Sequence, residues 1–250
     1  MERAEWLKKV RTMAEALYDH GAPAYWEKFG LRMDEMHRQF IEKFLSRLGA
    51  QSTILDAACG AGLYDSVLFE AGHIVLGIDQ SVGMLSRARQ HYPQEHFSGI
   101  RYEKIGLQEM DFHEAFDGAI CMDAMEHICP EDWTGIVEGF HKALKVGGVL
   151  YVTVDALKLP GDDKAYERAK AMGLPVVFGE IVDELDEVYR LAMGMDALEA
   201  ASIGERLDLS VYHYHPSMEQ VRTWFDQAGL SIEEEETGDE YVHLLARKHA

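Results

Sequence analysis

From Thr53 onward, short apolar segments alternate along the chain with segments that carry a helical pattern. The apolar segments are TILDAA, HIVLGID, IRYEKIG, FDGAICMD and GGVLYVTV. Strands that alternate with helices in this way form right-handed βαβ units on one parallel sheet. The alternation therefore predicts an α/β fold with a doubly wound, mostly parallel sheet.

The C-terminal part of the chain adds two further strands to this prediction. The runs SIEEEE and EYVHLLARK are joined by the short turn TGD, and so tight a connection makes an antiparallel pair. A helical pattern at PSMEQVRTWFDQAGL precedes them. We therefore expect a seven-stranded sheet that ends in an antiparallel C-terminal hairpin.

Helical patterns also flank the core. We expect helices over residues 3–19 and 32–48, with the segment GAPAYWEKFG as a break between them. The segments KLPGDDKAYERAKAMGLP and DELDEVYRLAMGMDALEAA look helical and do not continue the sheet, which predicts a helical insertion that acts as a substrate lid. The expected organisation is an N-terminal helical cap (1–49), a core (50–156), the helical insertion (157–211), and a C-terminal helix with antiparallel strands that complete the core sheet (212–250).

Composition restricts the classes of partner. The formal net charge is −20, from 44 acidic and 24 basic residues, and such a field repels phosphate backbones. The three cysteines form no CxxC pair, which disfavours a zinc site or a disulfide framework. No segment is apolar enough for a membrane span, and the first residues contain no apolar signal region. We expect a cytoplasmic protein that binds neither nucleic acid nor membrane.

The glycine-containing loop AACGAG follows the first predicted strand. Ligands of open α/β sheets lie beyond the carboxyl ends of the strands, and Gly60 and Gly62 let the backbone turn tightly there. A dinucleotide fingerprint would need a third glycine where this chain has Asp65, which counts against NAD. A P-loop is excluded because no Gly-Lys-Ser/Thr follows. Without other motifs, the two glycines could equally form a plain strand–helix turn.

Two acids end the first two predicted strands. Asp79 is placed to accept two hydrogen bonds from a ribose diol, although it could instead cap the following helix, a role that Ser81 could also fill. Asp56 precedes the glycine loop, where a bound ammonium group would suit it. A ligand with a ribose, a positively charged amino acid end and no phosphate fits these charges.

Four segments resemble motifs of the class I S-adenosylmethionine-dependent methyltransferases: ILDAACGAGLY, GIDQSVGMLSRAR, FDGAICMDAMEHI and HKALKVGGVLYVTV. The resemblance covers residues 50–156 and resumes from 212 to the end. It implies a Rossmann-like fold and S-adenosylmethionine as cofactor, with S-adenosylhomocysteine as product. The implied cofactor-binding residues are Tyr25, Asp56, Ala58, Cys59, Gly60, Gly62, Asp79, Gln80, Met84, Leu107, Gln108, Cys121 and Met122.

Some of these residues have a second interpretation. Met84 could be ordinary helix packing, and Tyr25 with its neighbour Trp26 could belong to the core instead of closing over the cofactor. The family often has an acid followed by alanine after the third strand, for the adenine amino group. This chain has Gly106 and Leu107 there, so the register of the adenine contacts is open.

Three histidines are candidate catalytic residues: His127, His213 and His215. Histidine titrates near neutral pH and can act as a general base. His213 and His215 lie in VYHYHPS, where an extended chain would place them on one face, and both could also be polar surface residues. His127 could equally pack or contact the cofactor.

The spacing Asp123-x-x-Glu126-His127 resembles the Glu-x-x-Glu-His motif with which some related methyltransferases bind a divalent metal. Oxygen and imidazole ligands could hold Mg²⁺ or Mn²⁺. Because Glu-His is also common here in members of the family without a metal, we predict none.

We expect a methyltransferase that acts on a small-molecule acceptor, with the acceptor atom, O, N or C, and the oligomeric state left open. Two alternatives remain. One is an NAD-dependent oxidoreductase, and the other is a non-catalytic protein that binds S-adenosylmethionine. A nucleic-acid methyltransferase is disfavoured by the net charge of −20.

Overall fold

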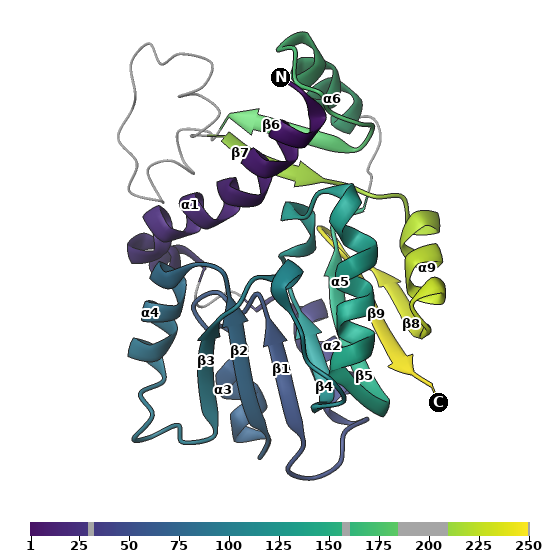
Figure 1. Ribbon diagram of the computed structural model, residues 1–250. Coiled ribbons are helices and arrows are strands. Elements are labelled where there is room, and N and C mark those ends of the chain that lie inside the picture. The colour runs from purple at the N-terminus through teal and green to yellow at the C-terminus, as the bar shows by residue number, and fades with distance from the viewer. Residues whose placement is uncertain (30–32, 157–160, 185–209, 250) are drawn as a thin grey trace.

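The computed structural model describes residues 1–29, 33–156, 161–184 and 210–249, and its centre is a seven-stranded sheet (Figure 1). The strand order is β3-β2-β1-β4-β5-β9-β8. The first five strands in this order are parallel, and β9 and β8 are antiparallel, which confirms the predicted sheet. The strands are β1 (Thr53–Ala57), β2 (Ile74–Asp79), β3 (Ile100–Lys104), β4 (Phe116–Cys121), β5 (Leu144–Val154), β8 (Leu230–Thr237) and β9 (Val242–Lys248).

Helices cover both faces of this sheet, so the central strands are apolar on both sides. Neighbouring residues of β1 show this, since Leu55 packs in the cluster that contains Phe140 of α5, whereas Ile54 packs with Phe44 of α2 and Leu68 of α3. The helices are α2 (Glu35–Leu45), α3 (Asp65–Glu70), α4 (Val82–His91), α5 (Pro130–Ala143) and α9 (Met218–Gln227), with short 3-10 turns η1 (Leu107–Glu109) and η2 (Met125–His127). None of the helices in the described ranges is both long and apolar enough to cross a membrane.

The N-terminal helix differs from its prediction. Helix α1 (Arg3–Phe29) runs without a break through Pro23, so the expected break at GAPAYWEKFG is wrong for its described part. Proline removes one helical hydrogen bond, and α1 contacts α4 on both sides of Pro23, since after it the ring of Trp26 lies 3.7 Å from the ring of His91, measured between centroids. A Cβ built on Gly83 of α4 would lie 2.9 Å from the carbonyl oxygen of Asp19 and 3.1 Å from the Cβ of Ala22. In Figure 1, α1 lies across the edge of the sheet where the parallel strands end.

The insertion is only partly helical. Helix α6 (Gly161–Ala171) is followed by strand β6 (Glu180–Glu184), which pairs in antiparallel fashion with β7 (Ser210–Tyr214) in a separate two-stranded sheet. The expectation of a helical insertion is therefore wrong at β6, where buried Ile181 and Val182 pair with strand β7. Most of the second predicted helix falls in 185–209, outside the described residues. The predicted boundary between residues 211 and 212 falls inside β7.

Candidate functional site

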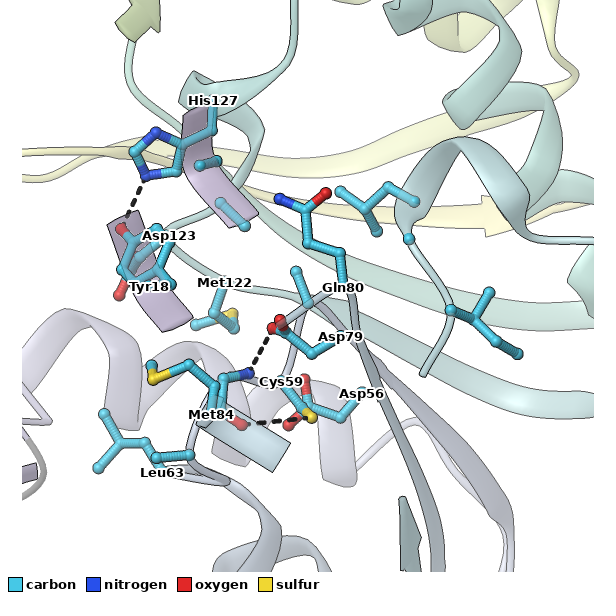
Figure 2. Close-up of a pocket in the computed structure, with 18 of the residues that line it drawn as sticks. Tyr18, Asp56, Cys59, Leu63, Asp79, Gln80, Met84, Met122, Asp123 and His127 are labelled. Carbon is cyan, nitrogen blue, oxygen red and sulfur yellow. Dashed lines mark hydrogen bonds between the residues drawn. The ribbon is translucent and has the colours of Figure 1, made fainter. Parts of the chain in front are cut away.

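A cavity opens at the carboxyl ends of the parallel strands (Figure 2). Its walls come from the residues that follow β1, β2, β3 and β4, and α1 supplies a further wall. The carboxyl edge of an open α/β sheet is the usual place for a ligand.

The glycine loop after β1 turns the chain below this cavity. Three of its residues have left-handed backbone conformations, Ala58 (φ 59°), Gly60 (φ 53°) and Gly62 (φ 81°). The Cys59 N–H donates to the carbonyl oxygen of Ile78 in β2 at 2.9 Å, which ties the loop to the neighbouring strand. The resulting turn directs the N–H of Gly60 toward the end of β2.

Asp79 ends β2 and is fixed by two backbone donors. Its Oδ2 accepts the Gly60 N–H at 2.9 Å (Figure 2), and its Oδ1 accepts the Ser81 N–H at 2.8 Å. Burial raises the pKa of Asp79, and the two backbone hydrogen bonds lower it. Burial is the larger effect, so the pKa is about 6. The carboxylate is therefore mainly ionised at neutral pH, and each oxygen keeps lone-pair capacity for a ligand hydroxyl. The N-cap of α4 is Ser81, whose Oγ accepts the Met84 N–H, so Asp79 is not needed as the cap.

Asp56, in β1 just before the glycine loop, also lines the cavity. Its carboxyl group is buried, and its Oδ2 has no hydrogen-bond partner among the described residues. Burial and the neighbouring Asp65 raise the pKa of Asp56 well above its ordinary value. A buried acceptor without a donor is costly in an empty site and suits a ligand cation.

The predicted cofactor residues converge on this cavity. Tyr25, Asp56, Ala58, Cys59, Gly60, Asp79, Gln80, Met84, Leu107, Gln108 and Met122 all line it. Trp26 lines it as well, and its ring stacks on His91 with centroids 3.7 Å apart.

Two of the predicted cofactor residues are not in the lining, Gly62 and Cys121. Gly62 packs against the side chains of Asp65 and Tyr102. A Cβ on Gly62 would lie 2.7 Å from Asp65 Oδ2 and 2.8 Å from Tyr102 Oη. Cys121 is fully buried in the core at the end of β4.

Sequence reasoning missed the contribution of the first half of α1. Arg11, Ala14 and Tyr18 line the cavity together with Tyr25. Their spacing of three, four and seven residues places them on one face of a helix, which is the signal that could have found them. The other lining residues that were not predicted are Ala61, Leu63, Tyr64, Ile105, Gly106, Asp123, Ala124 and Ile128.

His127 lines the cavity as a neutral imidazole. Burial lowers its pKa to about 4. Its Nδ1 lies 3.2 Å from the carbonyl oxygen of Tyr212, so Nδ1 carries the proton and Nε2 accepts the Tyr18 hydroxyl at 2.8 Å (Figure 2). The other two candidate histidines are not among the lining residues. The His213 ring contacts the His127 ring, with centroids 5.1 Å apart, and His215 Nε2 lies 3.3 Å from Asp155.

The three side chains of the Asp-x-x-Glu-His motif have separate partners. Asp123 Oδ1 lies 2.9 Å from His37 Nε2, Glu126 Oε1 accepts the Tyr241 hydroxyl at 3.3 Å, and His127 binds Tyr18. Among the described residues, no group of three or more His, Cys, Asp or Glu side chains is arranged to hold a metal ion.

The parallel sheet with helices on both faces and the cavity at its carboxyl edge are those of a Rossmann-like fold. Residues 55–152 match the family model described as a methyltransferase domain. A ubiquinone biosynthesis O-methyltransferase from Acinetobacter baylyi is 33% identical over 109 residues, which are 42% of this chain and 45% of that protein. The chain thus spans about half the length of the first curated relatives that it matches.

Two solved structures share the fold. An S-adenosylmethionine-dependent methyltransferase from Methanosarcina mazei is 18% identical with a TM-score of 0.64, over 88% of this chain and 99% of that one. The 1,6-didemethyltoxoflavin-N1-methyltransferase of Burkholderia thailandensis is 15% identical with a TM-score of 0.63, over 100% of this chain and 92% of that one. The latter structure contains 1,6-didemethyltoxoflavin and S-adenosylhomocysteine.

Proposed function

We propose that this protein is an S-adenosylmethionine-dependent methyltransferase that acts on a small-molecule acceptor. The observation that carries the proposal is Asp79, an ionised carboxylate in the cavity lining that is fixed by the backbone of Gly60 and Ser81. A fixed carboxylate at this edge of the sheet is suited to a ribose diol. The match to the methyltransferase domain and the relatives described above support the same cofactor.

The other parts of the cavity fit the remaining groups of this cofactor. The partnerless oxygen of Asp56 would accept from the ammonium of the methionine part. Leu107 and Gln108, after β3, would border the adenine, and Met122, after β4, would lie near the sulfonium. Tyr25 and its neighbours would cover the cofactor with aromatic rings, which attract a positively charged sulfur. When bound, S-adenosylmethionine supplies a methyl group on that sulfur, which leaves as a neutral thioether.

Asp65 disfavours the alternative function, an NAD-dependent oxidoreductase. It occupies the third-glycine position of the dinucleotide fingerprint. Its carboxyl group is fully buried and accepts the Tyr102 hydroxyl at 2.6 Å. A buried carboxyl group at this position is unfavourable for a pyrophosphate, whereas a cofactor without phosphate leaves it undisturbed.

We place His127 on the acceptor side of the cavity. Its Nε2 accepts the Tyr18 hydroxyl and could accept an O–H or N–H of the acceptor instead. Methyl transfer depends mainly on alignment, so this hydrogen bond would position the acceptor. His213, which touches the His127 ring, would act through it as a positioning residue, and His215 would do so from the neighbouring position of the segment. The acceptor would be a small molecule, because a formal net charge of −20 repels nucleic acid.

We also propose a cytoplasmic location. The three cysteines, Cys59, Cys121 and Cys129, are free thiols in the structure. Free thiols are typical of a reducing compartment.

The test is the substitution Asp79→Ala with S-adenosylhomocysteine as ligand. Loss of a charged acceptor should weaken binding by about 1.5–3 kcal/mol, which is roughly 10- to 150-fold in Kd. The matched control is Asp111→Ala, which removes one acid whose side chain is 91% exposed and outside the cavity lining. Calorimetric titration should give an unchanged Kd for the control. Equal affinities for Asp79→Ala and the unmodified protein would refute the ribose assignment.

A further inference from the structure

Two carboxyl groups lie together beneath the glycine loop. Asp56 is 1% exposed and Asp65 is 0% exposed, and the neighbouring Asp65 is one of the causes that raise the pKa of Asp56. The Tyr102 hydroxyl donates to Asp65 Oδ2 at 2.6 Å. Asp56 Oδ2 and Asp65 Oδ1 have no hydrogen-bond donor among the described residues. The two carboxyl groups are therefore buried neighbours, and each has an oxygen without a donor.

The surroundings of this pair contain no positive charge among the described residues. The titratable groups that face it are Tyr64, Tyr92, Tyr102, Cys59, Cys121 and Asp79. Two ionised carboxylates cannot share a buried site without a cation, so one proton must stay on the pair. In agreement, burial raises the pKa of Asp65 to about 6 and raises the pKa of Asp56 further above its ordinary value.

The two members of the pair have different positions. Asp56 lines the cavity, whereas Asp65 lies outside the lining. Asp65 and Tyr102 are in contact with the glycine loop, because a Cβ on Gly62 would lie 2.7 Å from Asp65 Oδ2 and 2.8 Å from Tyr102 Oη. A ligand in the cavity can therefore contact Asp56 but not Asp65.

We propose that Asp65 makes Asp56 a proton-exchanging site, in which the proton shared by the two carboxyl groups is released to solvent when the ammonium group of a ligand's amino acid end binds Asp56. The exchange breaks one O–H bond and adds one cation, so the charge of the site is conserved. The inference rests on the proposed function for the identity of the ligand. It assigns a role to Asp65, which touches no ligand.

The exchange predicts a pH dependence of affinity. If one proton leaves for each ligand bound, Kd should fall by up to about tenfold per pH unit wherever the free pair keeps its proton and the ligand amine is charged. A ligand that lacks the amino acid end should show no such dependence.

The experiment is calorimetric titration with S-adenosylhomocysteine in phosphate and in imidazole buffer, whose ionisation enthalpies differ. The difference in observed heat gives the number of protons released. We expect a value approaching one for the unmodified protein and close to zero for Asp65→Asn, whose amide can donate to an ionised Asp56. The control is Tyr102→Phe, which keeps both carboxyl groups and should keep the release. A second ligand, 5′-methylthioadenosine, has the ribose and adenine without the ammonium and should bind without release.

The outcomes separate this inference from the proposed function. Binding of S-adenosylhomocysteine without proton release, or equal release by Asp65→Asn, would overturn the exchange and leave the cofactor assignment intact. If S-adenosylhomocysteine does not bind at all, the proposed function fails, and the pair is tested directly by infrared spectroscopy. A protonated carboxyl band at neutral pH that disappears in Asp65→Asn supports the shared proton, and the absence of this band in the unmodified protein overturns it. Asp65→Ala serves as the second variant if Asp65→Asn does not fold.

Discussion

Gly62 is the position at which the glycine loop is most tightly constrained, and the substitution Gly62→Ala measures that constraint. The residue has a φ of 81°, where an L-residue costs about 1–2 kcal/mol. The new Cβ would lie 2.7 Å from Asp65 Oδ2, 2.8 Å from Tyr102 Oη and 2.9 Å from Tyr92 Cε2. The first two atoms belong to side chains joined by a 2.6 Å hydrogen bond, so neither can move without weakening it.

The expected loss of stability is the sum of two contributions. Overpacking in a filled site costs about 1–3 kcal/mol, which with the backbone cost gives about 2–5 kcal/mol. The matched control is Gly72→Ala. Gly72 also has a positive φ, 91°, but a Cβ there would meet nothing within 4 Å among the described residues. The control should therefore show the backbone cost alone, about 1–2 kcal/mol.

The assay is equilibrium unfolding in urea followed by circular dichroism, with the free energy extrapolated to zero denaturant. The account requires that Gly62→Ala lose more stability than Gly72→Ala by about 1 kcal/mol or more. If both variants lose the same amount, or if Gly72→Ala loses more, then the packing of the loop on Asp65 and Tyr102 is not what makes glycine necessary.

Two further predictions concern pH and metal ions. Because burial lowers the pKa of His127 to about 4, the unfolded chain, with an ordinary value near 6.5, binds more protons between these limits. The contribution of His127 to stability should therefore be complete above pH 6.5 and be lost as the pH falls toward 4, and thermal melts of His127→Gln should depend less on pH in this window. A steeper dependence in the variant would contradict the neutral imidazole. Because Asp123, Glu126 and His127 each bind a different partner, excess EDTA should leave the affinity for S-adenosylhomocysteine unchanged, and a chelator-induced loss restored by Mg²⁺ would contradict this.

The core sheet could be predicted because its signals are local. Each βαβ unit contains a short apolar run and a helical pattern within a few tens of residues, and the turn TGD specifies the C-terminal hairpin. The loop after β1 and the acids that end β1 and β2 follow from the same units, because the carboxyl ends of parallel strands meet at one edge. Most of the predicted cofactor residues therefore lie in one cavity.

The features that the sequence did not predict depend on contacts between distant parts of the chain. Pro23 indicates a helix end locally, and the packing of α1 on α4, which accompanies the continuous helix, is not visible in any local pattern. Strand β6 depends on pairing with β7, whose first residue lies 26 positions after the last residue of β6, at Ser210 and Glu184. Likewise, Tyr18 meets His127 although 109 residues separate them, and no local pattern indicates that contact.

The central claim is the identity of the cofactor, and calorimetric titration of the unmodified protein tests it most directly. The ligands are S-adenosylmethionine, S-adenosylhomocysteine and, as the rival, NAD. The account predicts micromolar binding of the first two and no binding of NAD. Binding of NAD, or of none of the three, would contradict the assignment of the cavity beside Asp79 to S-adenosylmethionine.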